Sequence, residues 1–241
     1  MIIYLLIGLF AGFMSGMFGI GGGSIRIPLL NLAGLPLLNA FGINLLVIPF
    51  SSMVGAISQR KNIDKKVALY VIIGGTLGSI TGAFWVGLIS SLYLAILFVI
   101  VSILTVFGIY LDRIIPKFYQ KINPHPSILI GGSFLLNIIT GMRGGSGGSL
   151  FPSFLKTMKL NIHKAVATSL FVTMFTATAA TAIYWHRGNI IWIPALFVLI
   201  GSMIGARVGS KVSLKTKPLG LEIGLTVLVI ILAFAVIYKA L

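Results

Sequence analysis

Long apolar runs separated by short polar gaps are the feature that most restricts how this chain can fold. Residues 41–58, 67–88, 92–111 and 165–185 form four such runs, and each is close to the roughly 20 residues that a helix needs to cross a lipid bilayer. Hydrophobic residues make up 58% of the 241 residues and charged residues only 9%, against about 25% charged in a soluble domain. The pattern excludes a soluble globule and a disordered chain, and it predicts a polytopic, all-α membrane protein.

The charge balance favours a membrane surface over nucleic acid as the partner. The chain has 18 Lys and Arg residues against 3 Asp and Glu residues. Most of the cations lie in gaps between apolar runs, without a basic stripe or interleaved aromatic residues. We therefore interpret them as topology signals beside anionic lipids, and we expect a multi-pass protein of the cell membrane. The N-terminal run lacks a basic start and a cleavage site, so we interpret it as a retained membrane segment.

Residues that bind metals or act as catalysts are scarce in this chain. It has no cysteine, and His125, His163 and His186 are far apart in predicted loops, so we expect neither a metal site nor a cofactor. No carboxylate falls near the middle of a predicted crossing. This argues against a membrane-embedded enzyme, and also against a proton or sodium site built on carboxylates.

An internal repeat at an offset near 125 residues divides the chain into two halves. Residues 16–19 (GMFG) match residues 141–144 (GMRG), and residues 22–25 (GGSI) match residues 147–150 (GGSL). Residues 112–126, the longest polar stretch, form the predicted cytoplasmic linker between a first repeat at 1–111 and a second at 127–241. Further matches are Asn44-Leu45 with Ser169-Leu170 and, at an offset of 127, Gly74, Gly78 and Gly82 with Gly201, Gly205 and Gly209.

The distribution of cations predicts how the two halves are oriented. If each glycine cluster is the tip of a hairpin that enters and leaves on one face, each half has three crossings and the halves are inverted. The cytoplasmic side then holds 13 cations and the outside 2, whereas four crossings in each half give 9 and 6. We therefore predict two inverted repeats with about six full transmembrane helices, two glycine-broken re-entrant helical hairpins, and both termini outside.

The two glycine clusters are predicted to break helices inside the protein, where non-helical backbone is tolerated at membrane depth. Ser24 and Ser149 directly follow the glycines and are predicted N-caps of the returning helices. Two helix N-termini that meet near the midplane would form an anion site. The alternative is that Gly and Ser only permit close packing, which is our interpretation of the spaced glycines at 74–82 and 201–209.

Arg26 and Arg143 lie within apolar runs beside the two glycine clusters. A cation inside a bilayer needs a partner or water, and the chain has too few acids to pair both arginines routinely. An oxyanion is a suitable partner, because a guanidinium group binds it bidentately. Snorkelling to the interface is the alternative for both, and it is our preferred interpretation for Arg207.

Polar residues early in the following crossings complete the predicted site. Asn44, Thr168 and Ser169 occupy matched places in the two halves, where they can orient the same ligand or serve only as contacts between helices. The predicted substrate-binding residues are Gly21, Gly22, Gly23, Ser24, Arg26, Asn44, Arg143, Gly144, Gly145, Ser146, Gly147, Gly148, Ser149, Thr168 and Ser169.

The two glycine motifs, set in a duplicated apolar chain with basic internal loops, resemble the TauE/SafE sulfite exporter family. The resemblance covers nearly the whole chain and rests on residues 16–28 and their repeat at 141–152. It implies an inner-membrane permease with two related halves that moves sulfite, sulfonates, other sulfur-containing anions or small organic acids. The second motif departs from the first at Ser146, which replaces a glycine, and at Pro152, which comes one residue early.

These features together predict a permease for a small anion that alternates access by rocking of its halves. A passive anion channel is the nearest alternative, and it would need a continuous wetted path and weak binding at several sites. A membrane subunit without transport activity is a further alternative, and such a protein would bind no anion.

Overall fold

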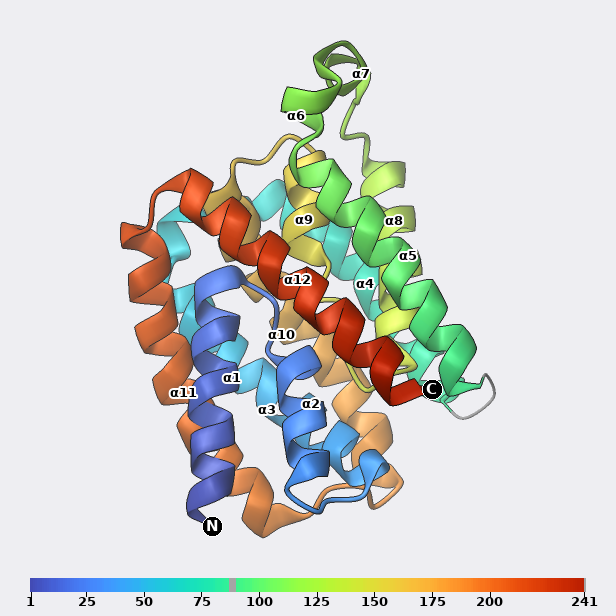
Figure 1. The fold of residues 1–241 in the computed structure, drawn as a ribbon, viewed down its shortest axis with the longest axis vertical. Helices are drawn as coiled ribbons and strands as arrows, with labels where there is room; N and C mark the ends of the chain where they lie inside the picture. The colour runs from blue at the N-terminus through green and yellow to red at the C-terminus, as the bar shows by residue number, and fades with distance from the viewer. Residues whose placement is uncertain (87–89, 241) are drawn as a thin grey trace.

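In the computed structural model, which describes residues 1–86 and 90–240, the chain is all-helical with no strand in those ranges. Figure 1 shows the helices α1 to α12. Among the described residues, four helices are long and apolar enough to cross a membrane. They are α3 (Leu37–Ser58), α4 (Lys65–Phe84), α10 (Ile162–His186) and α11 (Trp192–Lys215). The predicted all-α fold is therefore confirmed.

The first glycine cluster joins α1 (Ile2–Phe18) to the shorter α2 (Gly23–Leu32). Gly22 is the N-cap of α2 and has φ 75°, a left-handed conformation that residues with a side chain rarely adopt. The helix therefore begins at Gly23, and no side chain caps it. The prediction that Ser24 is the N-cap is wrong, because a glycine already forms the turn that a serine cap would provide.

The second cluster joins α8 (Pro126–Gly141) to α9 (Phe151–Thr157). The N-cap of α9 is Leu150, and Pro152 lies in the first turn of the helix. Proline is favoured there because its missing N–H has no partner to lose. The helix start is consequently set by Pro152, and the prediction that Ser149 is the N-cap is also wrong.

The segment predicted as a linker contains two short helices, α6 (Leu111–Ile114) and α7 (Pro116–Lys121). It is flanked by α5 (Ser91–Ile109) and α8. A 3-10 turn, η1 (Arg60–Asn62), precedes α4, and α12 (Pro218–Ala240) ends the described chain. His163 and His186 lie in α10 rather than in loops, so that part of the sequence interpretation is wrong. His125 precedes α8 as its N-cap.

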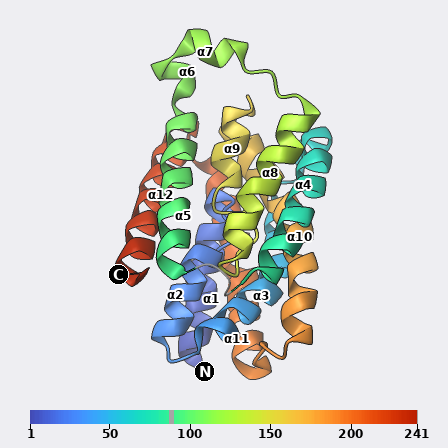
Figure 2. The same cartoon turned by 90° about the vertical axis from the view of Figure 1, so that its right-hand side faces the viewer.

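The two ends of the molecule carry different connections. In Figure 1 the α3–α4 turn, the α6–α7 segment, the α9–α10 turn and the α11–α12 turn lie toward the upper end. The N-terminus and the α2–α3 and α10–α11 turns lie toward the lower end. The α1–α2 hairpin opens toward the lower end and the α8–α9 hairpin toward the upper one, and Figure 2 shows the same arrangement from the side.

Helix pairing is exchanged between the two halves: α1 packs along α11, and α8 packs along α4. Small residues on the facing sides allow this close approach. The larger Leu69, Ile73 and Leu77 of α4 lie on its exposed face instead. A Cβ added to the spaced glycines would meet backbone atoms of the partner helix, which confirms their interpretation as packing stripes. These glycines are Gly74, Gly78 and Gly82 against α8, and Gly201, Gly205 and Gly209 against α1.

Candidate functional site

The loops at the tips of the two hairpins touch each other beside α10. A Cβ added to Gly148 would lie 2.8 Å from the carbonyl oxygen of Ile20 and 3.0 Å from the amide nitrogen of Gly21. A Cβ added to Gly21 would lie 3.0 Å from Cγ2 of Thr173 and 3.8 Å from Cα of Gly148. Segments that are more than a hundred residues apart in sequence therefore form one continuous backbone contact.

Two hydrogen bonds tie these loops to the opposite half of the chain. Asn44 of α3 donates from Nδ2 to the carbonyl of Gly144 at 2.7 Å, and Ser169 of α10 donates from Oγ to the carbonyl of Gly19 at 2.6 Å. Donors and acceptors are matched at the same offset of 125 residues. The bonds satisfy loop carbonyls that lie outside helices, as buried backbone requires.

Arg26 lies in α2 with its side chain fully buried, at 0% exposure. Its Nη1 donates to Oδ1 of Asn44 at 2.6 Å and its Nη2 to Oγ of Ser202 at 3.2 Å, while Nε is buried without a partner. Both partners are neutral. Snorkelling is therefore wrong for Arg26, because the side chain points inward to α3 and α11.

Arg143 occupies the second loop in a different way. Its guanidinium carbon lies 4.9 Å from the centre of the Phe98 ring of α5, and its Nη1 is buried without a hydrogen-bond partner. The side chain thus has spare donor capacity. Arg26 and Arg143 contact different helices, and within residues 1–86 and 90–240 no contact joins the two guanidinium groups.

Hydroxyl groups of α10 and of the second loop lie beside the loop contact. Thr176 donates from Oγ1 to the carbonyl of Ser146 at 3.1 Å. The hydroxyls of Ser146 and Thr173 are buried and have no hydrogen-bond partner. Sequence reasoning missed Thr173 and Thr176, although Ser169, Thr173 and Thr176 follow the i, i+4, i+7 spacing of one helix face.

Thr168, Ser24 and Ser149 take no part in the contacts described above. Thr168 lies away from the loop contact, because its Oγ1 accepts a hydrogen bond from the amide of Asp64 just before α4. Ser24 is half-buried in the first turn of α2, and Ser149 is buried before α9. The structure brings together Gly21, Gly22, Gly23, Arg26, Asn44, Gly144, Gly145, Ser146, Gly147, Gly148 and Ser169, in and around the two loops.

The all-helical chain, in which two glycine loops meet, matches the model of a known family. The model described as Sulfite exporter TauE/SafE matches residues 4–236. The chain belongs to this family of membrane transporters. The resemblance seen in the two glycine motifs is thereby confirmed over nearly the whole sequence.

Curated relatives of this TauE/SafE family chain are named as membrane transporters. The chain is 28% identical over 229 residues to probable membrane transporter protein YunE of Bacillus subtilis (strain 168), which covers 83% of this chain and 84% of that protein. It is 28% identical over 202 residues to YdhB of the same organism, with 80% and 82% covered. It is 26% identical over 197 residues to ORF9 of Sinorhizobium sp, with 80% and 75% covered. No solved structure matches the chain.

Proposed function

We propose that this protein is a multi-pass cell-membrane permease that moves a small anion by alternating access. Sulfite, a sulfonate or a related organic anion fits the family description and the donor groups of the site. The observation that carries the proposal is the contact between the two glycine loops, with unpartnered buried donors on Arg26, Ser146 and Thr173 beside it and on Arg143 in the second loop. Unpaired buried donors are costly, and a bound oxyanion would accept their hydrogen bonds.

The proposal includes an inverted repeat with about six crossings and two re-entrant hairpins. The exchanged pairing of α1 with α11 and of α8 with α4 supports it, as do hairpins that open toward opposite ends. The turns with most of the cations share the upper end of Figure 1, which would be the cytoplasmic side facing anionic lipids. Both loop tips would then lie near the membrane midplane, where broken helices of transporters bind substrates.

The two halves contribute different donors to this site. The first turn of α2 supplies amide groups without intrahelical partners and the positive end of its dipole, and Arg26 adds a fixed positive charge. The second half supplies the Arg143 guanidinium and the Ser146 and Thr173 hydroxyls. The direct contact between the loops favours a carrier that opens to one side at a time over a continuously open pore.

Anion flux into proteoliposomes tests the role of Arg143. The variant Arg143→Ala removes donors that hold the substrate, so uptake of sulfite at low concentration should fall about tenfold to a hundredfold, as for one or two lost charge-assisted hydrogen bonds. Arg207→Ala is the matched control, because Arg207 is exposed on α11. Equal flux in the wild type and Arg143→Ala would refute the role of Arg143. Wild-type protein that neither transports sulfite or sulfonates nor gains thermal stability from them would refute the proposed substrate class.

A further inference from the structure

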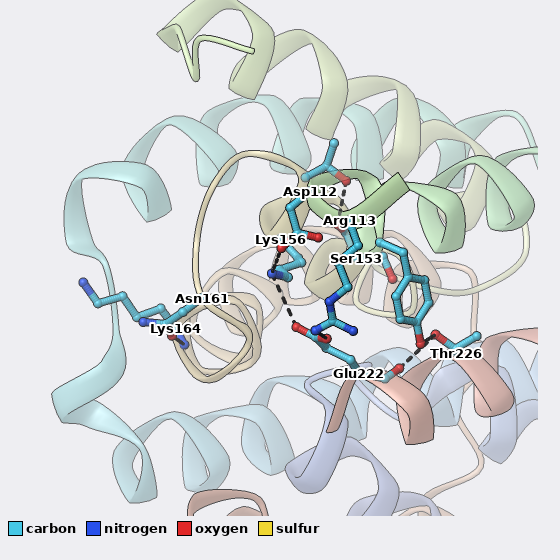
Figure 3. A network of polar contacts seen from close by, with 10 residues as sticks. Asp112, Arg113, Ser153, Lys156, Asn161, Lys164, Glu222 and Thr226 are labelled. Carbon is cyan, nitrogen blue, oxygen red and sulfur yellow. Dashed lines mark hydrogen bonds and ion pairs between the residues drawn. The ribbon is translucent and has the colours of Figure 1, made fainter. Parts of the chain in front are cut away.

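A cluster of charged side chains lies at the open end of the second hairpin, away from its glycine loop (Figure 3). Nζ of Lys156, in the last turn of α9, lies 3.3 Å from Oδ2 of Asp112 and 3.4 Å from Oε1 of Glu222. Arg113 donates from Nη2 to Oε2 of Glu222 at 2.7 Å. Asp112 and Arg113 belong to α6 and Glu222 to α12, so one side chain of α9 is bound to both of those helices.

Burial makes these contacts stronger than ordinary surface ion pairs. The side chain of Glu222 is 4% exposed and that of Lys156 is 12% exposed, so solvent and salt screen their attraction weakly. Two of the three acids in the chain converge on Lys156. Every ion pair recorded among residues 1–86 and 90–240 belongs to this cluster.

The short helix α9 depends on such contacts for its position. It has 7 residues, too few for a helix to be stable by itself. The N-terminus of α9 follows the second loop, whose Gly148 contacts Ile20 of the first loop, and the last turn of α9 contains Lys156. The turn after α9 is tied to the linker as well, because Lys159 donates to the carbonyl of Gln120 at 3.0 Å. The first hairpin differs, since α2 has no basic residue in its last turn.

We propose that Lys156 is a positioning residue that keeps the second hairpin closed at the upper end of Figure 1. The turns with most of the cations, which we call the lysine-rich turns, lie at this end. Its bonds to Asp112 and Glu222 clamp α9 between the linker and α12. Opening of the loop contact toward that side requires Lys156 to leave both carboxylates. The inference rests on the proposed alternating-access function, and it adds the element that controls access from one side.

Side-specific labelling tests this role, and the absence of native cysteine makes a single reporter possible. Ser146→Cys places a buried reporter in the second loop, and a membrane-impermeant maleimide is added to the face of the vesicle with the lysine-rich turns. Lys156→Gln in this background should raise the labelling rate about two- to fivefold, a change of up to about 1 kcal/mol, because Arg113 still pairs with the Glu222 carboxylate after Lys156 is lost. Lys156→Arg keeps the charge and should restore the slow rate. Maleimide added to the opposite face should show no rise.

The matched control is Lys164→Gln, because Lys164 is an exposed lysine nearby on α10 (Figure 3). Labelling that is unchanged in Lys156→Gln, or that rises equally in Lys164→Gln, overturns the proposal. If Lys156→Gln does not accumulate in membranes, Asp112→Asn removes one of the two carboxylate charges and keeps the side-chain volume. It should give a smaller rise in the same direction, and an unchanged rate there overturns the proposal too.

Flux measured in parallel vesicles that hold the protein without the Ser146→Cys change separates this inference from the proposed function. Sulfite flux that depends on Arg143, together with labelling that ignores Lys156, removes only the role of Lys156. Labelling that follows Lys156, together with wild-type protein that shows no anion flux, removes the permease assignment and leaves the clamp as a conformational element.

Discussion

The two glycine hairpins match at an offset of 125 residues, yet they place their arginines at different points. In the first hairpin Phe18 ends α1 and Arg26 lies in the return helix, whereas in the second Arg143 takes the place of Phe18 and Phe151 that of Arg26. Arg26 is fully buried with two neutral hydrogen-bond partners. Arg143 is half-buried over the ring of Phe98 and keeps one nitrogen without a partner.

This exchange suggests different physical roles for the two guanidinium groups. Arg26 is built into the fold, because its bond to Asn44 continues through the amide of that residue to the carbonyl of Gly144 in the opposite loop. Arg143 has no such chain of hydrogen bonds among the described residues, so its donors are available to a ligand. A site of this kind combines a charge held in place by hydrogen bonds, that of Arg26, with one whose donors can bind a ligand, that of Arg143.

The comparison fails most directly if Arg26 proves dispensable for the fold. Arg26→Ala leaves a cavity at a fully buried position and removes the donors to Oδ1 of Asn44 and Oγ of Ser202. After allowing for the relief of burying a charge, the free energy of unfolding should fall by about 2–4 kcal/mol. Arg143→Ala should lower it by about 1 kcal/mol or less, as for a lost contact with an aromatic ring. Denaturant unfolding of both purified variants measures the difference, and equal losses would contradict the assigned roles.

The next test concerns the loop contact shared by the hairpins. Gly148→Ala places a methyl group 2.8 Å from a backbone oxygen of Ile20, and backbone cannot move aside as a flexible side chain can. We expect a loss of about 1–3 kcal/mol in stability, as for overpacking of a core, together with a loss of anion flux. Gly131→Ala in α8 is the control, since nothing lies within 4 Å of its added Cβ. That change should be neutral or slightly stabilising, and a destabilised control would undermine the test.

Sequence patterns predicted the architecture of these hairpins better than their hydrogen bonds. Apolar runs and glycine clusters act locally, and they fixed where helices form and where they break. The N-caps were mispredicted because Gly22 can adopt a left-handed turn and because Pro152 prefers the first turn of a helix. The bond of Arg26 to Ser202 spans 176 positions, and only the packing of helices from both halves brings these residues together. Whether the assembled residues bind an anion stays a prediction.

The two bonds that tie a glycine loop to the opposite half offer a smaller and more selective comparison. Asn44 makes one bond to Arg26 and one to the Gly144 carbonyl, whereas Ser169 makes one bond to the Gly19 carbonyl. At about 1 kcal/mol for each net hydrogen bond, Asn44→Ala should cost roughly twice as much stability as Ser169→Ala.

Asn44→Asp separates the two functions of Asn44. The carboxylate can still accept from Arg26, but it has no donor for the Gly144 carbonyl, and two oxygens then face each other. If the tie across the halves matters for transport, flux should fall in Asn44→Asp although the partner of Arg26 is kept. Flux that survives in Asn44→Asp and disappears in Asn44→Ala would show instead that Asn44 acts only by holding Arg26. In that case the exchange of Arg and Phe between the hairpins, rather than the bonds between halves, would determine how the loops are positioned.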